Sequence, residues 1–203
     1  WLDYPERERE LAIVRSQADY RRRLDLAEAL MDQRNGYERL SRTDVLTGLC
    51  NRRVFSTTLN EQVRQMLSGS GSVVTLILMD IDHFKSINDR FGHIIGDEAL
   101  KRFANMLERS FNTPDMLVAR TGGEEFAVVA TGMNEAAVMA RPEAFRSETA
   151  AEHLQIAGLQ IPLTVSIGVG TFNLEQHRHD HGSYGAVDIA LYDAKQQGRN
   201  RVD

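Results

Sequence analysis

The sequence contains one cysteine, Cys50, and only four prolines in 203 residues. A single cysteine excludes an internal disulfide framework and a cysteine-based zinc site. A chain without disulfides suits a reducing compartment, so we expect a cytoplasmic location. The chain begins at Trp1 without a charged and then apolar leader, and we expect it to be a piece of a longer protein.

Long apolar runs and an excess of positive charge are also missing. The longest apolar stretches, such as residues 73–79, have the length of a strand and fall far short of the roughly 20 residues that span a bilayer. The formal net charge is −5, whereas proteins that act on nucleic acid or anionic lipid usually carry a basic surface. We therefore expect no nucleic acid among the partners and no membrane contact by this fragment.

The length allows one well-cored domain and an appended segment. Residues 5–40 are rich in Arg, Glu, Asp, Ala and Leu, a composition that favours one long charged helix. Steps of four and three mark an imperfect heptad seam at Ile13, Gln17, Tyr20, Leu24, Ala27, Met31 and Arg34. We expect residues 1–42 to form a helical stalk that dimerises as a coiled coil, followed by one domain over residues 43–203. A solvated helix packed on its own domain is the alternative, because two seam positions are polar.

Helical and strand patterns alternate through the main domain. Apolar residues at helical spacing predict helices over residues 52–67, from Gly96 onward, over 136–154 and over 187–197. Short β-branched and aliphatic runs predict strands over residues 73–79, 116–119, 126–130 and 163–171. The expected fold class is α/β, with a central sheet that contains antiparallel strands and is flanked by helices.

Acidic residues follow one predicted strand and one predicted turn. Asp80, Ile81 and Asp82 come directly after the strand over 73–79, and the turn between the two short strands carries Gly122, Gly123, Glu124 and Glu125. Carboxylates in such places suit Mg²⁺, which takes a few carboxylates and then substrate phosphates. Glycines permit positive φ and let a ligand lie directly on the backbone. The pattern predicts a nucleotide site, with a glycine turn followed by solvated acids as the alternative.

Five segments carry longer motifs: DVLTGLCNRRVF over 44–55, DIDHFKSINDRFGHIIGD over 80–97, RTGGEEF over 120–126, VSIG over 165–168 and ALYDAKQQGRN over 190–200. Together, and in this order, they resemble the GGDEF family of diguanylate cyclases. The resemblance implies a palm-like α/β domain with a central antiparallel sheet. It also implies an activity in bacterial second-messenger signalling: two GTP molecules are condensed to cyclic di-GMP and two pyrophosphates at a dimer interface.

The resemblance assigns the metal site and the catalytic groups. Asp80, the carbonyl of Ile81 and Glu124 match the metal ligands, with Glu125 as a further candidate. Two Mg²⁺ ions per active site are expected, with Mn²⁺ as a substitute. Glu124 also matches the group that deprotonates or orients the 3′-hydroxyl of GTP, and Lys85 matches the transition-state stabiliser.

The resemblance also assigns the contacts with GTP. Asn88 and Asp97 match the residues that read guanine, since an amide and a carboxylate together complement its edge and adenine cannot satisfy both. The alternative role for Asp97 is that of a helix N-cap. His93 matches a substrate-contacting position in a loop. The remaining expected contacts are Gly122, Gly123, Lys195 and Arg199, the last two lying four apart on one face of the final helix.

The expected partners are GTP, a second copy of the chain through the stalk, and a regulatory protein that binds the stalk. Two other functions stay open. One is a catalytically degenerate GGDEF module that binds GTP or scaffolds a partner, and the other is a cyclase that makes a mixed cyclic dinucleotide. The intact glycine and glutamate pairs, with Asp80, Lys85 and Asn88, argue against the degenerate module.

Overall fold

The structure, a computed structural model, describes residues 42–69, 71–172 and 183–203, with positions 17, 20–24, 26 and 27 ahead of them. The chain divides into two units, residues 1–41 and 42–203. In the first unit the described positions are helical, and the rest of the predicted seam lies outside the described residues. The dimerising stalk therefore stays a prediction. None of the described helices is long and apolar enough to cross a membrane.

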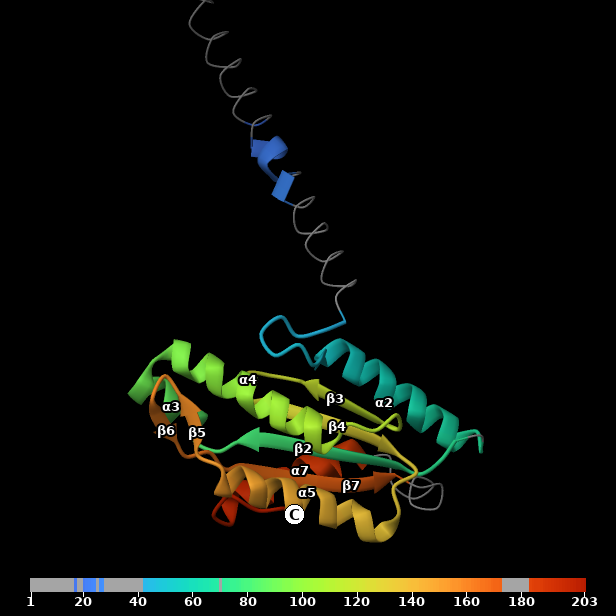
Figure 1. The fold of residues 1–203 in the computed structure, drawn as a ribbon. Coiled ribbons are helices and arrows are strands. Elements are labelled where there is room, and N and C mark those ends of the chain that lie inside the picture. The colour runs from blue at the N-terminus through green and yellow to red at the C-terminus, as the bar shows by residue number, and fades with distance from the viewer. Residues whose placement is uncertain (1–16, 18–19, 25, 28–41, 70, 173–182) are drawn as a thin grey trace, which may run out of the picture. The chain divides into compact units, whose positions relative to one another are not determined.

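A five-stranded sheet forms the centre of the second unit (Figure 1). Its strands, in spatial order, are β1 (Cys50–Asn51), β3 (Met116–Arg120), β4 (Glu125–Thr131), β2 (Val74–Ile81) and β7 (Val165–Phe172). β1 and β3 are parallel, and all other neighbours are antiparallel. A separate hairpin joins β5 (Leu154–Ile156) to β6 (Leu159–Ile161). The predicted α/β fold with an antiparallel-containing sheet is confirmed.

Helices cover both faces of this sheet. They are α2 (Arg52–Leu67), α3 (Phe84–Phe91), α4 (His93–Ser110), α5 (Glu135–Ala151) and α7 (Ser183–Gln196). In Figure 1, α4 and α5 cross the front of the sheet and α7 lies behind it. The front core is aromatic: the ring of Phe103 lies 4.8 Å from that of Phe126 and 5.4 Å from that of Phe145. The second core, behind the sheet, gathers side chains from α2 and α7.

Strand β2 lies between the two cores, and all eight of its residues are buried. Side chains alternate along a strand, so Ile77 and Met79 belong to the front core, whereas Leu76 and Leu78 belong to the second. Asp80 continues the second set. The strand thus delivers a carboxylate at its C-terminal end, on the side of the sheet that α7 covers.

Helix α2 has the bounds that the sequence predicts. It begins at Arg52 because the side chain of Asn51 accepts a hydrogen bond from the Val54 N–H at 3.1 Å, which satisfies a free donor of the first turn. The predicted strands also form, with boundaries that shift by one or two residues. The strand expected over 73–79 runs on through Asp80 and Ile81.

The region between β2 and β3 differs from the prediction. The sequence pattern does not predict α3, and it predicts the next helix from Gly96 onward, whereas α4 begins at His93. Gly92 separates the two helices with a φ of 83°, a conformation that few other residues adopt. The short helix α3 and the longer helix α4 therefore pack against each other, and Gly96 lies inside α4.

The helix predicted over 136–154 also ends too late. Helix α5 stops at Ala151, and Leu154 begins the β5–β6 hairpin. The chain reverses through Ala157 and Gly158, which both have positive φ. An alanine at such a position carries no turn signal in the sequence, so this small hairpin was not predicted.

Candidate active site

The C-terminal end of β2 and the turn between β3 and β4 meet at one end of the sheet. Asp80 pairs with Glu125 in the antiparallel register, and the Ile81 N–H donates to the carbonyl of Glu124 at 3.2 Å. From α7, the ammonium Nζ of Lys195 lies 2.8 Å from Oδ2 of Asp80. The fold thus brings together five residues that the sequence analysis assigned to metal or substrate.

These carboxylates repel one another in a partly dry environment. Burial raises the pKa of Asp80, and Glu125 and Asp82 raise it further, while the ion pair with Lys195 acts in the opposite direction without cancelling the shift. Burial and the charge of Asp80 likewise raise the pKa of Glu124. The site therefore holds more negative charge than Lys195 balances, so it favours a cation.

The donor set fits magnesium. Its groups are carboxylate and carbonyl oxygens, which Mg²⁺ prefers over nitrogen or sulfur. Among the described residues, however, no three His, Cys, Asp or Glu side chains are close enough to form a ready-made metal group. Mg²⁺ commonly binds one or two protein carboxylates and completes its coordination shell with water and substrate phosphates, so it does not require such a group.

The two glycines of the turn matter because they lack a side chain, not because of their backbone conformation. Neither Gly122 nor Gly123 has positive φ, so neither uses the left-handed conformation that a glycine permits. A Cβ atom at Gly122 would overlap Oε2 of Glu125, whereas a Cβ at Gly123 would meet nothing within 4 Å. Gly122 makes room for the Glu125 carboxylate, and the space beside Gly123 is open. A ligand contact at Gly123 stays a prediction.

Arg120 holds this turn in place. Its guanidinium donates to the carbonyl of Gly123 through Nε at 3.2 Å and Nη2 at 2.7 Å, and to Oδ1 of Asp44 through Nη1 at 3.0 Å. Asp44 also accepts hydrogen bonds from the N–H and the hydroxyl of Thr47. The glycine turn is therefore tied to the segment that begins the domain.

The Asp44 network predicts a pH effect on stability. Burial raises the pKa of Asp44, but the hydrogen bonds from Thr47 and Arg120 outweigh it, so its pKa is lower than the ordinary 3.8. A depressed pKa means that the stabilisation is present above pH 3.8 and is lost as the pH falls below it. We expect Asp44→Asn to lower the urea-unfolding free energy at pH 6 and to cost less at pH 3. The exposed control Asp115→Asn should show no such difference, and an equal cost at both pH values would contradict the network.

The expected guanine-reading residues lie on α3 and α4. Asn88 is on α3, and Asp97 is the fifth residue of α4, so it is not an N-cap and that alternative is wrong. His93 is the first residue of α4 rather than a loop residue. A Cβ atom at Gly96 would overlap Oδ1 of Asn88. The Asn88 side chain therefore rests against α4 at Gly96, the residue before Asp97.

Two cations of the expected site lie in different settings. Lys85 is exposed in the first turn of α3, just after the strand that carries Asp80. Arg199 does not share a helix face with Lys195, because α7 ends at Gln196 and Arg199 has a φ of 64° in the following turn. The prediction that Lys195 and Arg199 share one face of the final helix is wrong.

Asp82 is an important residue whose role the sequence did not reveal. Its buried carboxylate accepts hydrogen bonds from the hydroxyls of Thr164 and Ser166, at 2.8 and 2.7 Å, and from the N–H of Asn200 at 3.0 Å. With both oxygens occupied, Asp82 anchors the turn after Lys195 rather than binding metal. The only hint was its place two residues after Asp80.

Comparison with known proteins identifies the family. The family described as "Diguanylate cyclase, GGDEF domain" matches residues 41–201. The chain belongs to the GGDEF family.

Curated relatives of this GGDEF chain carry the name of the enzyme. Probable diguanylate cyclase DgcT of Escherichia coli (strain K12) is 35% identical over 164 residues, which are 80% of this chain and 35% of the relative. Diguanylate cyclase DgcP of Pseudomonas aeruginosa is 37% identical over 161 residues, which are 79% of this chain and 23% of the relative. The chain thus spans at most about a third of the length of these two relatives.

Solved GGDEF structures share the fold. The coiled coil and GGDEF domain of DgcB from Caulobacter crescentus, in complex with c-di-GMP, has a TM-score of 0.73 at 29% identity and covers 92% of this chain and 97% of that one. Diguanylate cyclase SiaD of Pseudomonas aeruginosa, in complex with its activator SiaC, has a TM-score of 0.70 at 27% identity and covers 99% of this chain and 79% of that one.

Proposed function

We propose that the domain is a diguanylate cyclase that condenses two GTP molecules into cyclic di-GMP and releases two pyrophosphates. The observation that carries this proposal is the meeting of Asp80, Glu124, Glu125 and Lys195 at the end of β2. Acidic oxygens beside a movable cation suit a triphosphate with its metal ions. Relatives named as diguanylate cyclases support the same activity.

In the proposed reaction, Asp80, the Ile81 carbonyl, Glu124 and Glu125 would hold two Mg²⁺ ions. Once bound, those ions would neutralise phosphate charge and polarise the α-phosphoryl group. Because a bound metal ion would balance the charge of Asp80, Lys195 would be able to pair with a phosphate oxygen instead. Lys195 lies in the last turn of α7, and its ammonium is 2.8 Å from Asp80 Oδ2.

The chain's own groups position the nucleophile and the transferred phosphorus. Glu124, whose pKa is raised by burial and by Asp80, takes or orients the proton of the 3′-hydroxyl. Lys85, from the first turn of α3, stabilises charge on the transferring phosphoryl group. Gly123 lets the triphosphate approach the backbone, and Arg199 and His93 add further contacts with GTP.

Asn88 and Asp97 select guanine in this proposal. The carboxylate of Asp97 accepts from the guanine N1 and N2 hydrogens, and the Asn88 amide meets a neighbouring acceptor. An adenine ring would leave these polar groups unpaired, which costs affinity. GTP is therefore the expected substrate rather than ATP.

The spacing at Gly96 predicts a change in GTP affinity. In Gly96→Ala the new methyl group displaces the Asn88 side chain, whereas the helix itself gains propensity and stays folded. We expect KM for GTP to rise about tenfold with little change in kcat, because ground-state and transition-state contacts with guanine weaken alike. Initial rates against GTP concentration measure this. Ala99→Gly, in the same helix, is the stability control, and an unchanged KM would remove Asn88 from the guanine site.

One such site cannot complete the reaction. Each domain holds one GTP, so two domains must face each other for each 3′-hydroxyl to reach the other α-phosphate. The stalk over residues 1–42 supplies the second copy by raising the local concentration of one domain about the other. The coiled coil in the DgcB structure supports this arrangement. The activator bound to SiaD supports a regulatory protein acting on such a chain.

Removing residues 1–40 tests the stalk. We expect the specific activity to fall and to depend steeply on protein concentration, because pairing of the half-sites becomes bimolecular. GTP binding should survive, since each half-site stays intact. Activity equal to that of the full chain at submicromolar concentration would show that another surface dimerises the domain.

The proposed reaction is tested by its product. The protein is incubated with Mg²⁺ and GTP, or with GTP and ATP together, and the products are identified by mass. Cyclic di-GMP alone supports the proposal. A mixed cyclic dinucleotide would replace it with a cyclase of altered specificity, and GTP binding without product would make the chain a degenerate module. In a cell, we propose a cytoplasmic location, where GTP and Mg²⁺ are available.

A further inference from the structure

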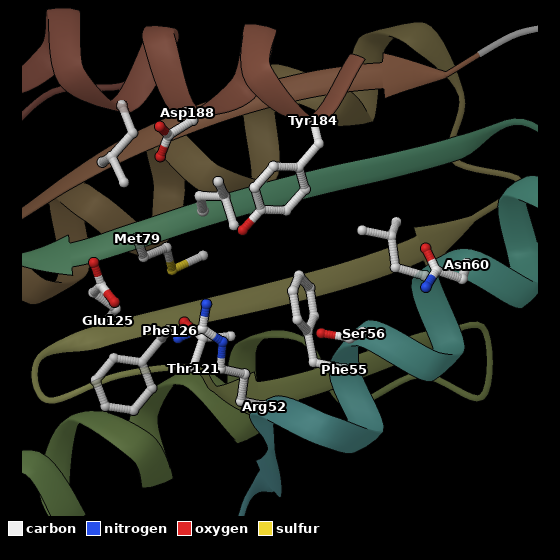
Figure 2. A pocket seen from close by; sticks show the side chains of 13 residues that line it. Arg52, Phe55, Ser56, Asn60, Met79, Thr121, Glu125, Phe126, Tyr184 and Asp188 are labelled. Atoms are coloured by element: carbon white, nitrogen blue, oxygen red, sulfur yellow. The ribbon is translucent and has the colours of Figure 1, made fainter. Parts of the chain in front are cut away.

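A groove between α2 and α7 lies beside the glycine turn, and apart from Glu125 its lining residues have no role in the proposed reaction (Figure 2). Its volume is about 300 Å³, at the lower end of the range for small-molecule pockets. The floor consists of buried apolar side chains of the second core: Phe55, Leu59, Leu78 and Leu191. A ligand could therefore bury an apolar ring here without displacing any part of the fold.

The rim of this groove is polar and carries both charges. Arg52 and Ser56 lie on α2, and Tyr184 and Asp188 lie on α7, so the groove has a cationic side and an anionic side. Figure 2 shows the rings of Phe55 and Tyr184 pointing into the groove from these two helices. An apolar floor between opposite charges is the complement of a molecule that carries opposite charges on an apolar centre.

The charges of the rim do not satisfy one another. Within the described part of the chain, the side chains of Arg52, Tyr184 and Asp188 make no hydrogen bond or ion pair. All three line the same groove. Burial and Asp188 raise the pKa of Tyr184, and Arg52 lowers it. The Arg52 guanidinium can therefore donate hydrogen bonds to a ligand, and the Asp188 carboxylate can accept them.

We propose that this groove binds a zwitterionic aromatic molecule of the size of a free aromatic amino acid. The carboxylate of the ligand is held by Arg52, its ammonium group by Asp188, and its ring lies on the floor between Phe55 and Tyr184. A phosphorylated nucleotide fits less well, because its phosphates would lie near both Asp188 and Glu125. An uncharged lipid-like molecule would desolvate both charged sides without compensation.

Occupation of the groove affects the active site, and this step rests on the proposed function. The groove shares Thr121, Glu125 and Phe126 with the turn and strand that carry the metal-binding residues. The ligand's ammonium attracts the Glu125 carboxylate into the groove and away from its proposed metal. The ligand therefore acts as an inhibitor that lowers turnover.

Binding is tested apart from activity. The full chain is titrated with L-tryptophan or L-phenylalanine to about 10 mM and followed by NMR, with an expected Kd of about 1 mM or tighter. Indole supplies a ring without charges, and glycine supplies charges without a ring. Each should bind at least about tenfold more weakly, because each lacks one half of the recognition.

Charge variants locate the ligand. Arg52→Gln and Asp188→Asn should each weaken binding about tenfold while circular dichroism stays unchanged. The matched controls Arg53→Gln and Asp193→Asn should bind normally. Combining R52D with D188R exchanges the two charges, so it should restore binding that either single reversal abolishes. The proposal would be overturned if indole bound as tightly as tryptophan, if guanosine bound more tightly, or if the titration did not saturate. It would also be overturned if neither Arg52→Gln nor Asp188→Asn changed the Kd.

The effect on turnover is read in a separate assay. If the proposed function holds, saturating L-tryptophan lowers the rate of cyclic di-GMP formation several-fold in the parent chain and not in Asp188→Asn. Binding without any change in rate would overturn the inhibitory coupling and leave the binding site standing. A chain that binds tryptophan but makes no product would instead refute the proposed function.

Discussion

We expect Glu124→Gln to leave a folded protein whose turnover in the proposed cyclase reaction is at least about a hundredfold lower. The substitution keeps the shape of the side chain and removes its charge. It thereby removes a proposed metal ligand and the group nearest the nucleophile in one step. The raised pKa of Glu124, caused by burial and by Asp80, indicates that this carboxylate already faces the other charges of the site. Mass detection of cyclic di-GMP over time measures the effect.

Two comparisons make this test specific. Glu148→Gln changes an exposed glutamate on α5 and should keep full turnover. The melting temperature of Glu124→Gln should equal or exceed that of the parent chain, because neutralising one of several close carboxylates relieves repulsion. Turnover within a few-fold of the parent would refute the assignment of Glu124.

The sequence predicts best where local chemistry and packing agree. Helix α2 has an N-cap at Asn51 and apolar residues at helical spacing, and its bounds follow directly. Strand β2 is apolar on both faces because helices cover the sheet on both sides. The hairpin of β3 and β4 follows from two short apolar runs around Gly122 and Gly123. These elements place the acidic end of the site, so its position was predictable.

The rest depends on contacts between distant segments. Helix α3 has eight residues, too few for a clear periodic pattern, and its start at His83 has a positive φ that no sequence rule indicates. The turn that removes Arg199 from α7 is held by Asp82, more than a hundred residues away. Motifs give the identity of such residues, but their spatial roles come from tertiary hydrogen bonds.

Asp82→Asn tests the largest of these tertiary effects. The two carboxylate oxygens of Asp82 accept hydrogen bonds from two hydroxyls and from the Asn200 N–H. An asparagine offers only one acceptor oxygen in their place. At least one of these donors therefore loses its partner. Losing a charge-assisted, buried set of this kind costs about 2–3 kcal/mol, which corresponds to a fall in melting temperature of about 5–10 °C for a domain of this size.

The same change should loosen the turn that carries Arg199. The segment after it pairs with β7 through Ile167, whose N–H donates to the Arg201 carbonyl at 2.9 Å, so this edge of the sheet loses support when Asn200 is released. We expect kcat/KM for GTP to fall about tenfold, mainly through KM, because Arg199 contacts the triphosphate in the proposed site. Thermal melting and initial rates measure the two effects, with exposed Asp115→Asn as the matched control. A melting temperature within 1–2 °C of the parent, a shift of under about 1 kcal/mol, would mean that pairing with β7 alone holds the C-terminal segment.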